Sequence, residues 1–219
     1  IDFFPLICDY QEKLYAVGKM PGGFLRREGK ASDEATLIAR QKDRPPRPLF
    51  PENYYNDVQV IATVLSMDHD HLPDPLTTIG ASIALGISDI PFDGPVGACM
   101  VGKVDGRLVV NPKEADREKS DLELTVAGKK GAINMVEAGA NELDESEMLE
   151  AMLFALEEIG DISDFIETII NDIGKEKKEV EEHLETDLDR AISESYGEKI
   201  KSSIRTTDKP ERADKMYAI

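Results

Sequence analysis

The stretch Val96-Gly-Ala-Cys-Met-Val-Gly-Lys-Val-Asp-Gly-Arg-Leu-Val-Val110 contains two apolar runs on either side of Asp105-Gly106. Asp-Gly between two such runs is a strong signal for a two-residue hairpin turn. A second pair of runs, Leu122 to Ala127 and Ala132 to Ala138, surrounds the turn-forming residues 128–131. The sequence therefore predicts a mixed or antiparallel sheet at the centre of the chain, with helices packed on it.

Upstream of this sheet the chain shows a strand signal and a helix signal. The apolar runs Phe3 to Tyr10 and Leu14 to Val17 flank a short polar segment, which predicts a hairpin. Ser32 stands before two acidic residues and predicts the start of a helix. This helix should end before Pro45, because proline cannot continue the helical hydrogen bonds.

The remaining segments extend the pattern to an α+β fold. Residues 58–67 are rich in β-branched side chains and predict a buried strand, whereas residues 76–88 predict a helix with small side chains. From Glu142 onward only helical spacing is found, and Gly174-Lys175 marks the end of one helix. The charged stretch 175–182 is typical of a solvated helical face. We therefore expect a mixed sheet packed with helices, followed by an all-α region.

Charge is distributed unevenly along the 219 residues. Residues 144–219 carry 22 acidic and 10 basic side chains, a difference of −12 within a net charge of −18. Between Lys19 and Arg47 the balance reverses, and basic side chains outnumber acidic ones. Because phosphate contacts dominate nucleic-acid affinity, any contact with RNA should be local and involve this basic segment.

The segment Pro21-Gly-Gly-Phe-Leu-Arg-Arg-Glu-Gly-Lys30 combines a flexible turn with apolar side chains and two adjacent guanidinium groups. Two arginines can bind phosphate oxygens, and a phenylalanine ring can stack on a base. The alternative is a solvated hairpin end that happens to be basic. A second basic stretch, residues 40–51, follows closely and favours RNA binding. The candidate RNA-binding residues are Phe24, Leu25, Arg26 and Arg27.

These stretches resemble, in the same order, the first RNase PH-like domain of the polynucleotide phosphorylase family. The matching motifs are Asp2 to Leu6, residues 21–29, residues 43–51, Val58 to Ser66, Ile79 to Ser82 and Ser88 to Pro95. The resemblance implies a ribosomal protein S5 domain 2-like fold over residues 1–174, with its N-terminal strands missing. Residues 175–219 would begin the all-helical linker domain of the family.

The resemblance implies a phosphorolytic 3′–5′ exoribonuclease that degrades single-stranded RNA with inorganic phosphate to nucleoside diphosphates. It also implies that Mg²⁺ and phosphate bind in the second core domain, outside this segment. Here Glu123 and Thr125 stand where that domain has its catalytic aspartate and lysine, and Arg117 replaces another aspartate. Pro73-Asp74-Pro75 replaces a serine-rich turn. We therefore expect the non-catalytic copy and assign no catalytic residue.

Within a ring-shaped homotrimer, the resemblance places residues 24–27 in a central channel, where they would guide RNA. Leu25 stands where the family commonly has a second aromatic residue, so apolar contact is expected there. Arg40, Arg44 and Arg47 either touch RNA or pair with acids to stabilise the turn. Lys42 and Pro46 replace residues that are usually apolar in the family. Further partners implied for such an enzyme are a helicase or an endoribonuclease.

Other residues suggest no further site. Asp68-His69-Asp70-His71 resembles a metal cluster but lies beside prolines and reads as a solvated turn, so no metal site is expected. Cys8 and Cys99 lie far apart without zinc-site spacing. No apolar run approaches the roughly 20 residues that span a bilayer. We expect a cytoplasmic location, no membrane contact, and a segment of a longer protein that begins before Ile1.

Two alternatives remain open from the sequence. The first is a non-catalytic RNA-binding ring scaffold of the same fold in an exosome-like assembly. The second is an acidic, helical protein-binding module, supported by residues 144–219 alone. A downstream second core domain would favour the enzyme over the scaffold.

Overall fold

The computed structural model describes residues 4–20, 22, 30–180 and 186–219. The chain divides into two compact units, residues 1–180 and 181–219. The first unit includes residues 175–180, beyond the boundary expected at residue 174. Within the described residues, no helix is long and apolar enough to cross a membrane.

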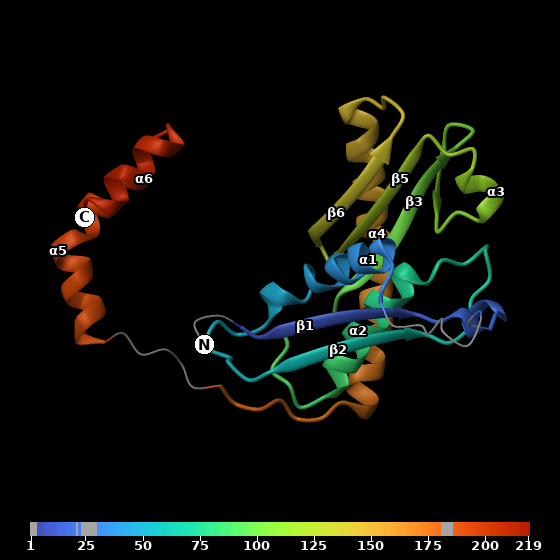
Figure 1. Ribbon diagram of the computed structural model, residues 1–219, viewed down its shortest axis with the longest axis horizontal. Coiled ribbons are helices and arrows are strands. Elements are labelled where there is room, and N and C mark those ends of the chain that lie inside the picture. The colour runs from blue at the N-terminus through green and yellow to red at the C-terminus, as the bar shows by residue number, and fades with distance from the viewer. Residues whose placement is uncertain (1–3, 21, 23–29, 181–185) are drawn as a thin grey trace. The chain divides into compact units, whose positions relative to one another are not determined.

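The first unit contains two sheets, several short helices and one long helix (Figure 1). Its elements in chain order are β1 (Leu6–Glu12), η1 (Leu14–Val17), α1 (Asp33–Asp43), η2 (Arg47–Leu49), β2 (Val58–Val64), α2 (Pro73–Ile87), β3 (Gly97–Val104), β4 (Arg107–Val110), α3 (Glu114–Arg117), β5 (Leu122–Lys129), β6 (Ala132–Ala140) and α4 (Glu145–Ile173). The α+β fold class expected from the sequence is therefore confirmed.

The larger sheet is antiparallel and has the strand order β4-β3-β5-β6. Asp105 and Gly106 connect β3 to β4 with φ angles of 50° and 75°, the left-handed conformation that a tight hairpin turn requires. Val104 pairs with Arg107 across this turn. The second predicted pair is also confirmed, with its turn at Lys130-Gly131. The two local hairpins therefore follow directly from the sequence.

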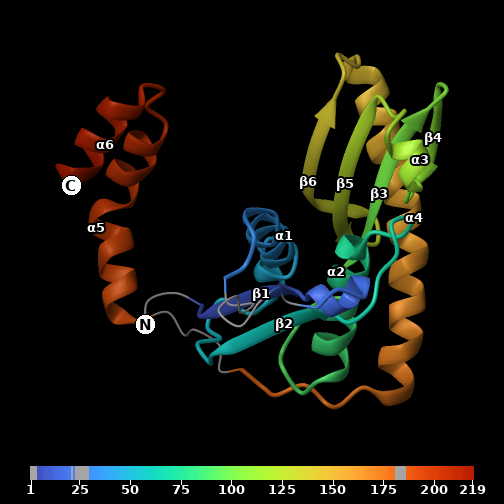
Figure 2. The ribbon, with the colours of Figure 1, turned by 45° about the vertical axis from the view of Figure 1, so that its right-hand side comes forward.

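Helix α4 packs along one face of this sheet and beside α2 (Figure 2). Asp144 and Glu147 form a capping box that satisfies free N–H groups at its start. Alternate residues of β3 and β5 point at α4, so that Val101, Leu124 and Ile159 are fully buried in one cluster. Each Å² of apolar surface that is buried stabilises the fold by about 25 cal/mol, so this cluster is a major source of stability.

The smaller sheet pairs β1 with β2 in parallel, with Leu6 opposite Val58. The hairpin expected between residues 3–10 and 14–17 is therefore wrong. Residues 14–17 form the short helix η1, which ends at Gly18 in the left-handed conformation with φ 70°. Strand β1 buries Leu6 and Tyr10 on one face, and its hydrogen-bonding partner lies about fifty residues further along the chain.

Helices α1 and α2 confirm two further predictions. The Ser32 hydroxyl accepts a hydrogen bond from the Ala35 N–H and caps α1, which ends at Asp43, before Pro45. Helix α1 packs against β1, and α2 contacts β2, β3 and α4. The two helices also touch each other, so that α1, β1 and the start of α2 surround one region of the unit.

Residues 174–180 are not helical, so the solvated helical face expected there is not found in the described residues. Instead, the Lys177 ammonium donates hydrogen bonds of 2.8–2.9 Å to the carbonyls of Leu85, Gly86 and Ser88. Those carbonyls lie at the C-terminal end of α2, where a cation is favoured. The backbone N–H groups of Lys175 and Lys178 also donate to the carbonyls of Ile87 and Asp89, so the segment is bound to the end of α2 by both side-chain and backbone hydrogen bonds.

The second unit is a pair of helices, α5 (Asp187–Ile204) and α6 (Lys209–Tyr217). Thr186 and Asp208 cap the two helices with their side-chain oxygens. Leu188, Ile192 and Tyr196 follow one another at a spacing of four residues on α5 and are exposed. The all-α character expected for the end of the chain is confirmed for residues 186–219, whereas residues 174–180 are not helical.

Candidate functional site

The four candidate RNA-binding residues Phe24, Leu25, Arg26 and Arg27 lie outside the described residues. Of the described residues nearby in the sequence, Met20 is 88% exposed, and Lys30 is exposed just before α1. The role of the four residues therefore stays a prediction, and the structure can be read only at their borders.

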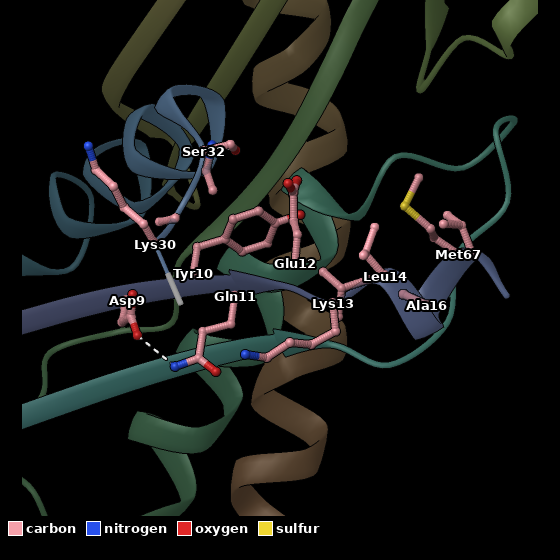
Figure 3. Close-up of a pocket in the computed structure, with 14 residues that line it drawn as sticks. Asp9, Tyr10, Gln11, Glu12, Lys13, Leu14, Ala16, Lys30, Ser32 and Met67 are labelled. Atoms are coloured by element: carbon pink, nitrogen blue, oxygen red, sulfur yellow. Dashed lines mark hydrogen bonds between the residues drawn. The ribbon is translucent and has the colours of Figure 1, made fainter. Parts of the chain in front are cut away.

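A hollow of about 440 Å³ lies between the end of β1, η1 and the start of α1 (Figure 3). Its charged residues include Glu12, Lys13 and Lys30, and its apolar residues include Val64 and Met67. In Figure 3, Tyr10 and Glu12 lie on one side of β1, while Asp9 and Gln11 lie on the other and share a hydrogen bond of 2.8 Å. Acids and bases are mixed here, so the hollow selects neither sign of ligand charge.

Arg47 has a structural role. Its guanidinium binds both oxygens of Asp43 at 2.7 and 3.0 Å and donates to the backbone carbonyls of Phe4 and Leu6 at 3.2 and 2.9 Å. These bonds connect the end of α1 to the start of β1. Of the two roles considered for the arginines, Arg47 takes the pairing role, whereas Arg40 and Arg44 are exposed at the end of α1.

Lys42 is buried in the same region, with only 4% of its surface exposed. Its ammonium lies 3.7 Å from the centroid of the Tyr10 ring and has no hydrogen-bond partner among the described residues. Burial lowers the pKa of Lys42 to about 8, and the nearby acids Asp74 and Glu12 oppose this shift. Burial likewise raises the pKa of Asp74, while Lys42 acts in the opposite direction.

The sequence contains a helical spacing that predicts the burial of Lys42, although the charge pattern does not reveal it. Ala35, Ile38 and Lys42 are the buried residues of α1 and have the spacing i, i+3, i+7. A lysine at the third position of such a stripe must bury at least its stem. Here the ammonium is buried as well.

The first turn of α2 lacks the features of a phosphate site. Two of its residues, Pro73 and Pro75, have no N–H to donate, and Asp74 between them is acidic. A neighbouring cavity of about 420 Å³ is lined by Arg117 and Glu123, among others. The Arg117 guanidinium is already bound to the carbonyls of Pro112 and His69, at 2.8 and 2.5 Å. This region therefore offers an anion little attraction.

The residues 68–71 form an exposed turn. The Asp68 carboxylate lies 2.8 Å from Nδ1 of His71 and accepts the backbone N–H groups of Asp70 and His71 at 2.9 Å. These bonds lower the pKa of Asp68, with the His71 side chain as the main cause. The part of the chain that the structure describes holds no group of three or more His, Cys, Asp or Glu side chains that could bind a metal.

Comparison with known proteins places these features in a family. The profile of the 3′ exoribonuclease family, domain 1, matches residues 1–91, and the profile of domain 2 matches residues 94–158. A polyribonucleotide nucleotidyltransferase of Finegoldia magna is 55% identical over the whole chain, and one of Clostridioides difficile is 55% identical over 99% of it. The chain spans 31% of the length of these relatives.

A solved structure supports the same fold at much lower identity. The crystal structure of rice (Oryza sativa) Rrp46 superimposes with a TM-score of 0.59 at 11% identity, covering 77% of this chain and 74% of that one. At this identity the likeness concerns the fold alone. Together with the two family profiles and the relatives at 55% identity, it shows that the chain belongs to the 3′ exoribonuclease family, as a relative of polyribonucleotide nucleotidyltransferases.

Proposed function

We propose that this chain is the non-catalytic first core domain of a phosphorolytic 3′–5′ exoribonuclease that acts on single-stranded RNA. The full-length protein would transfer the terminal nucleotide to inorganic phosphate, release a nucleoside diphosphate and take part in mRNA turnover. The observation that carries the proposal is the match of the whole chain to polyribonucleotide nucleotidyltransferases at 51–55% identity.

The non-catalytic assignment is supported by the first turn of α2 and by β5. Phosphorolysis needs an anion pocket and groups that stabilise negative charge in the transition state. Asp74 and Glu123 are acidic where such groups would be needed, and Arg117 is bound to backbone carbonyls. The described residues do not fit Mg²⁺, so we assign Mg²⁺ and phosphate to the second core domain, outside this chain.

The RNA-guiding role is assigned to Phe24, Leu25, Arg26 and Arg27. Adjacent arginines and an aromatic ring suit phosphate binding and base stacking. The exposed side chains of Arg40 and Arg44 add positive charge at the end of α1. We further propose a homotrimer with these residues along its channel, a cytoplasmic location, and contacts with RNA-degradation partners such as a helicase or an endoribonuclease.

The test is RNA phosphorolysis by the full-length protein with Arg26 and Arg27 both changed to alanine. We expect slower degradation of long single-stranded RNA, because two phosphate contacts are lost while the catalytic copy is untouched. Degradation of a very short substrate, which need not reach the channel, serves as the matched control. Equal rates for variant and wild type on the long RNA would contradict the guiding role.

A further inference from the structure

Lys42 is a buried cation at the meeting point of β1, α1 and the first turn of α2. Its 4% exposure rules out direct contact with RNA. Its ammonium contacts the ring of Tyr10, at 3.7 Å from the ring centroid, and no hydrogen bond to a described residue satisfies it. A cation on an aromatic face is attracted by the ring quadrupole, and the attraction strengthens when water is excluded.

The groups that face Lys42 come from two other elements. Glu12, Tyr10 and Cys8 lie on β1, and Asp74 lies in the first turn of α2. Glu34 of α1 adds negative charge that acts on Asp74 and Tyr10. Lys42 of α1 therefore sits where an acid of β1, Glu12, and an acid of α2, Asp74, both attract its charge.

Burying a charge costs desolvation free energy, so a buried cation is not the most stable way to pack helices and strands together. Replacement of a buried ion pair by apolar side chains of similar volume is often neutral or stabilising. Methionine would fill the same space beside Ile38 and Ala35 without a charge to desolvate. A stability argument alone would therefore favour an apolar residue at position 42, which points to a role in geometry.

We propose that Lys42 is a positioning residue for RNA binding: its ammonium holds the last turn of α1 against Tyr10 of β1 and Asp74 of α2. The inference rests on the proposed function, because α1 follows the basic segment 24–27 in the sequence and ends at the exposed Arg40 and Arg44. A shift of α1 would move those cations relative to RNA.

The experiment measures binding of single-stranded RNA to the full-length protein by fluorescence anisotropy at several salt concentrations. For Lys42→Met we expect about fivefold weaker binding, the size of a modest coupling between sites. The slope of log K against log salt should stay close to the wild-type value, because the displaced cations are weakened in their contacts but none of them is removed. Arg26→Ala/Arg27→Ala should instead reduce the magnitude of that slope by about 1.4, because each of two lost phosphate contacts on a single strand contributes about 0.7.

The pH profile gives a readout that a purely structural residue would not change. As Lys42 loses its proton between about pH 7 and about pH 9, the RNA affinity of the wild type should fall about fivefold. Lys42→Met should show no such fall over this pH range. Cys8 does not interfere, because burial raises its pKa to about 12, and burial raises the pKa of Tyr10 as well. Burial raises the pKa of Asp74, and the neighbouring Lys42 acts in the opposite direction.

Lys199 provides a matched control. It also lies over a tyrosine ring, at 5.7 Å from the centroid of Tyr196, but it is exposed on α5. Lys199→Met removes the same charge and leaves the same side-chain volume as Lys42→Met. We expect it to leave the RNA affinity, its salt slope and its pH profile at wild-type values.

Three results would overturn the positioning role. These are wild-type affinity in Lys42→Met, a salt slope reduced as in the arginine variant, or a pH profile identical to the wild type. If Lys42→Met does not fold, Asp74→Asn removes the opposing charge from α2 and should show the same loss at an unchanged slope; wild-type affinity there also overturns the role. Wild-type binding by Arg26→Ala/Arg27→Ala instead counts against the proposed function.

Discussion

The two sheets of the first unit bury different kinds of side chain against their helices. The four-stranded sheet meets α4 through side chains such as Val101, Leu124 and Ile159, each 0% exposed. The two-stranded sheet meets α1 beside a buried ammonium, Lys42, and is tied to it by the guanidinium of Arg47. The buried part of the first interface is an apolar cluster, whereas the second combines an apolar cluster that includes Tyr10, Ala35 and Ile38 with a buried ammonium.

This difference separates an interface that is expected to provide mainly stability from one that also contains the proposed positioning residue, Lys42. Apolar contacts are non-directional and tolerate small shifts. Contacts of a guanidinium with carbonyls, or of an ammonium with a ring, require a defined geometry. The second interface includes α1, which follows the proposed RNA-binding segment in the sequence, so the proposed positioning role belongs to this interface.

The largest expected effect tests the hydrophobic interface. Leu124→Ala should lower the free energy of unfolding by about 2–5 kcal/mol, because the vacated space lies between the sheet and α4 and cannot be filled by water-exposed groups. Urea unfolding followed by circular dichroism measures the loss. Leu149→Ala on the outer face of α4, where the side chain is 57% exposed, is the control and should change stability by less than about 0.5 kcal/mol.

The second prediction concerns pH and the charged interface. The pKa of Lys42 is lowered from 10.5 to about 8 in the folded state, so between these values the unfolded chain holds a proton that the folded chain has released. The free energy of unfolding should therefore rise with pH over this interval, by up to about 3 kcal/mol from this residue. Below about pH 8 Lys42 is protonated in the folded state, and the full cost of burying its charge lowers the free energy of unfolding.

Unfolding of wild type and Lys42→Met at pH 8 and pH 10.5 measures this contribution. The variant should lack the Lys42 part of the rise and should match or exceed wild-type stability at the lower pH. A variant that is less stable than the wild type at pH 8 but not at pH 10.5, where the folded-state Lys42 is neutral, would mean that the buried ammonium stabilises the fold.

The third prediction separates two arginines of the same turn. Arg47→Ala should cost about 1.5–3 kcal/mol, because Asp43 and the Leu6 carbonyl lose a charged donor, while the Phe4 carbonyl keeps only the Leu6 N–H. Arg44→Ala, at an exposed position, should leave the melting temperature close to the wild-type value. Equal losses for the two variants would show that the Arg47 network adds nothing specific.

The smallest effect is expected at the other end of α2. Lys177→Met should cost about 1–2 kcal/mol, because three carbonyls at the helix end lose a charged donor. Hydrogen exchange of residues 174–180 should increase in the variant. Lys178→Met, which removes only the exposed ion pair with Asp89 at 3.0 Å, is the control and should have little effect.

The sequence predicted best those elements whose contacts are local. Asp105-Gly106 predicted the turn between β3 and β4, and Ser32 with Pro45 predicted the limits of α1. In each case the deciding physics, a left-handed turn or a helix cap, involves residues next to one another. The four-stranded sheet and the helix α4 followed from the same kind of signal.

The hairpin expected between residues 3–10 and 14–17 failed for the opposite reason. Strand β1 has its partner in β2, and a parallel pairing leaves no turn signal between the two strands. The burial of Lys42 and the use of Arg47 also depend on residues distant in sequence, Asp74 and Phe4 among them. The sequence left Arg47 between contact with RNA and pairing with an acid, and its contacts show the pairing.

The most direct test of the central claim is RNA phosphorolysis by this chain alone beside the full-length protein, with magnesium and inorganic phosphate present. Circular dichroism establishes that the isolated chain is folded. The account predicts that the chain releases no nucleoside diphosphate while the full-length protein degrades the same RNA. Release of nucleoside diphosphates by the purified chain would contradict the non-catalytic assignment and return Glu123 and its neighbours to consideration as catalytic groups.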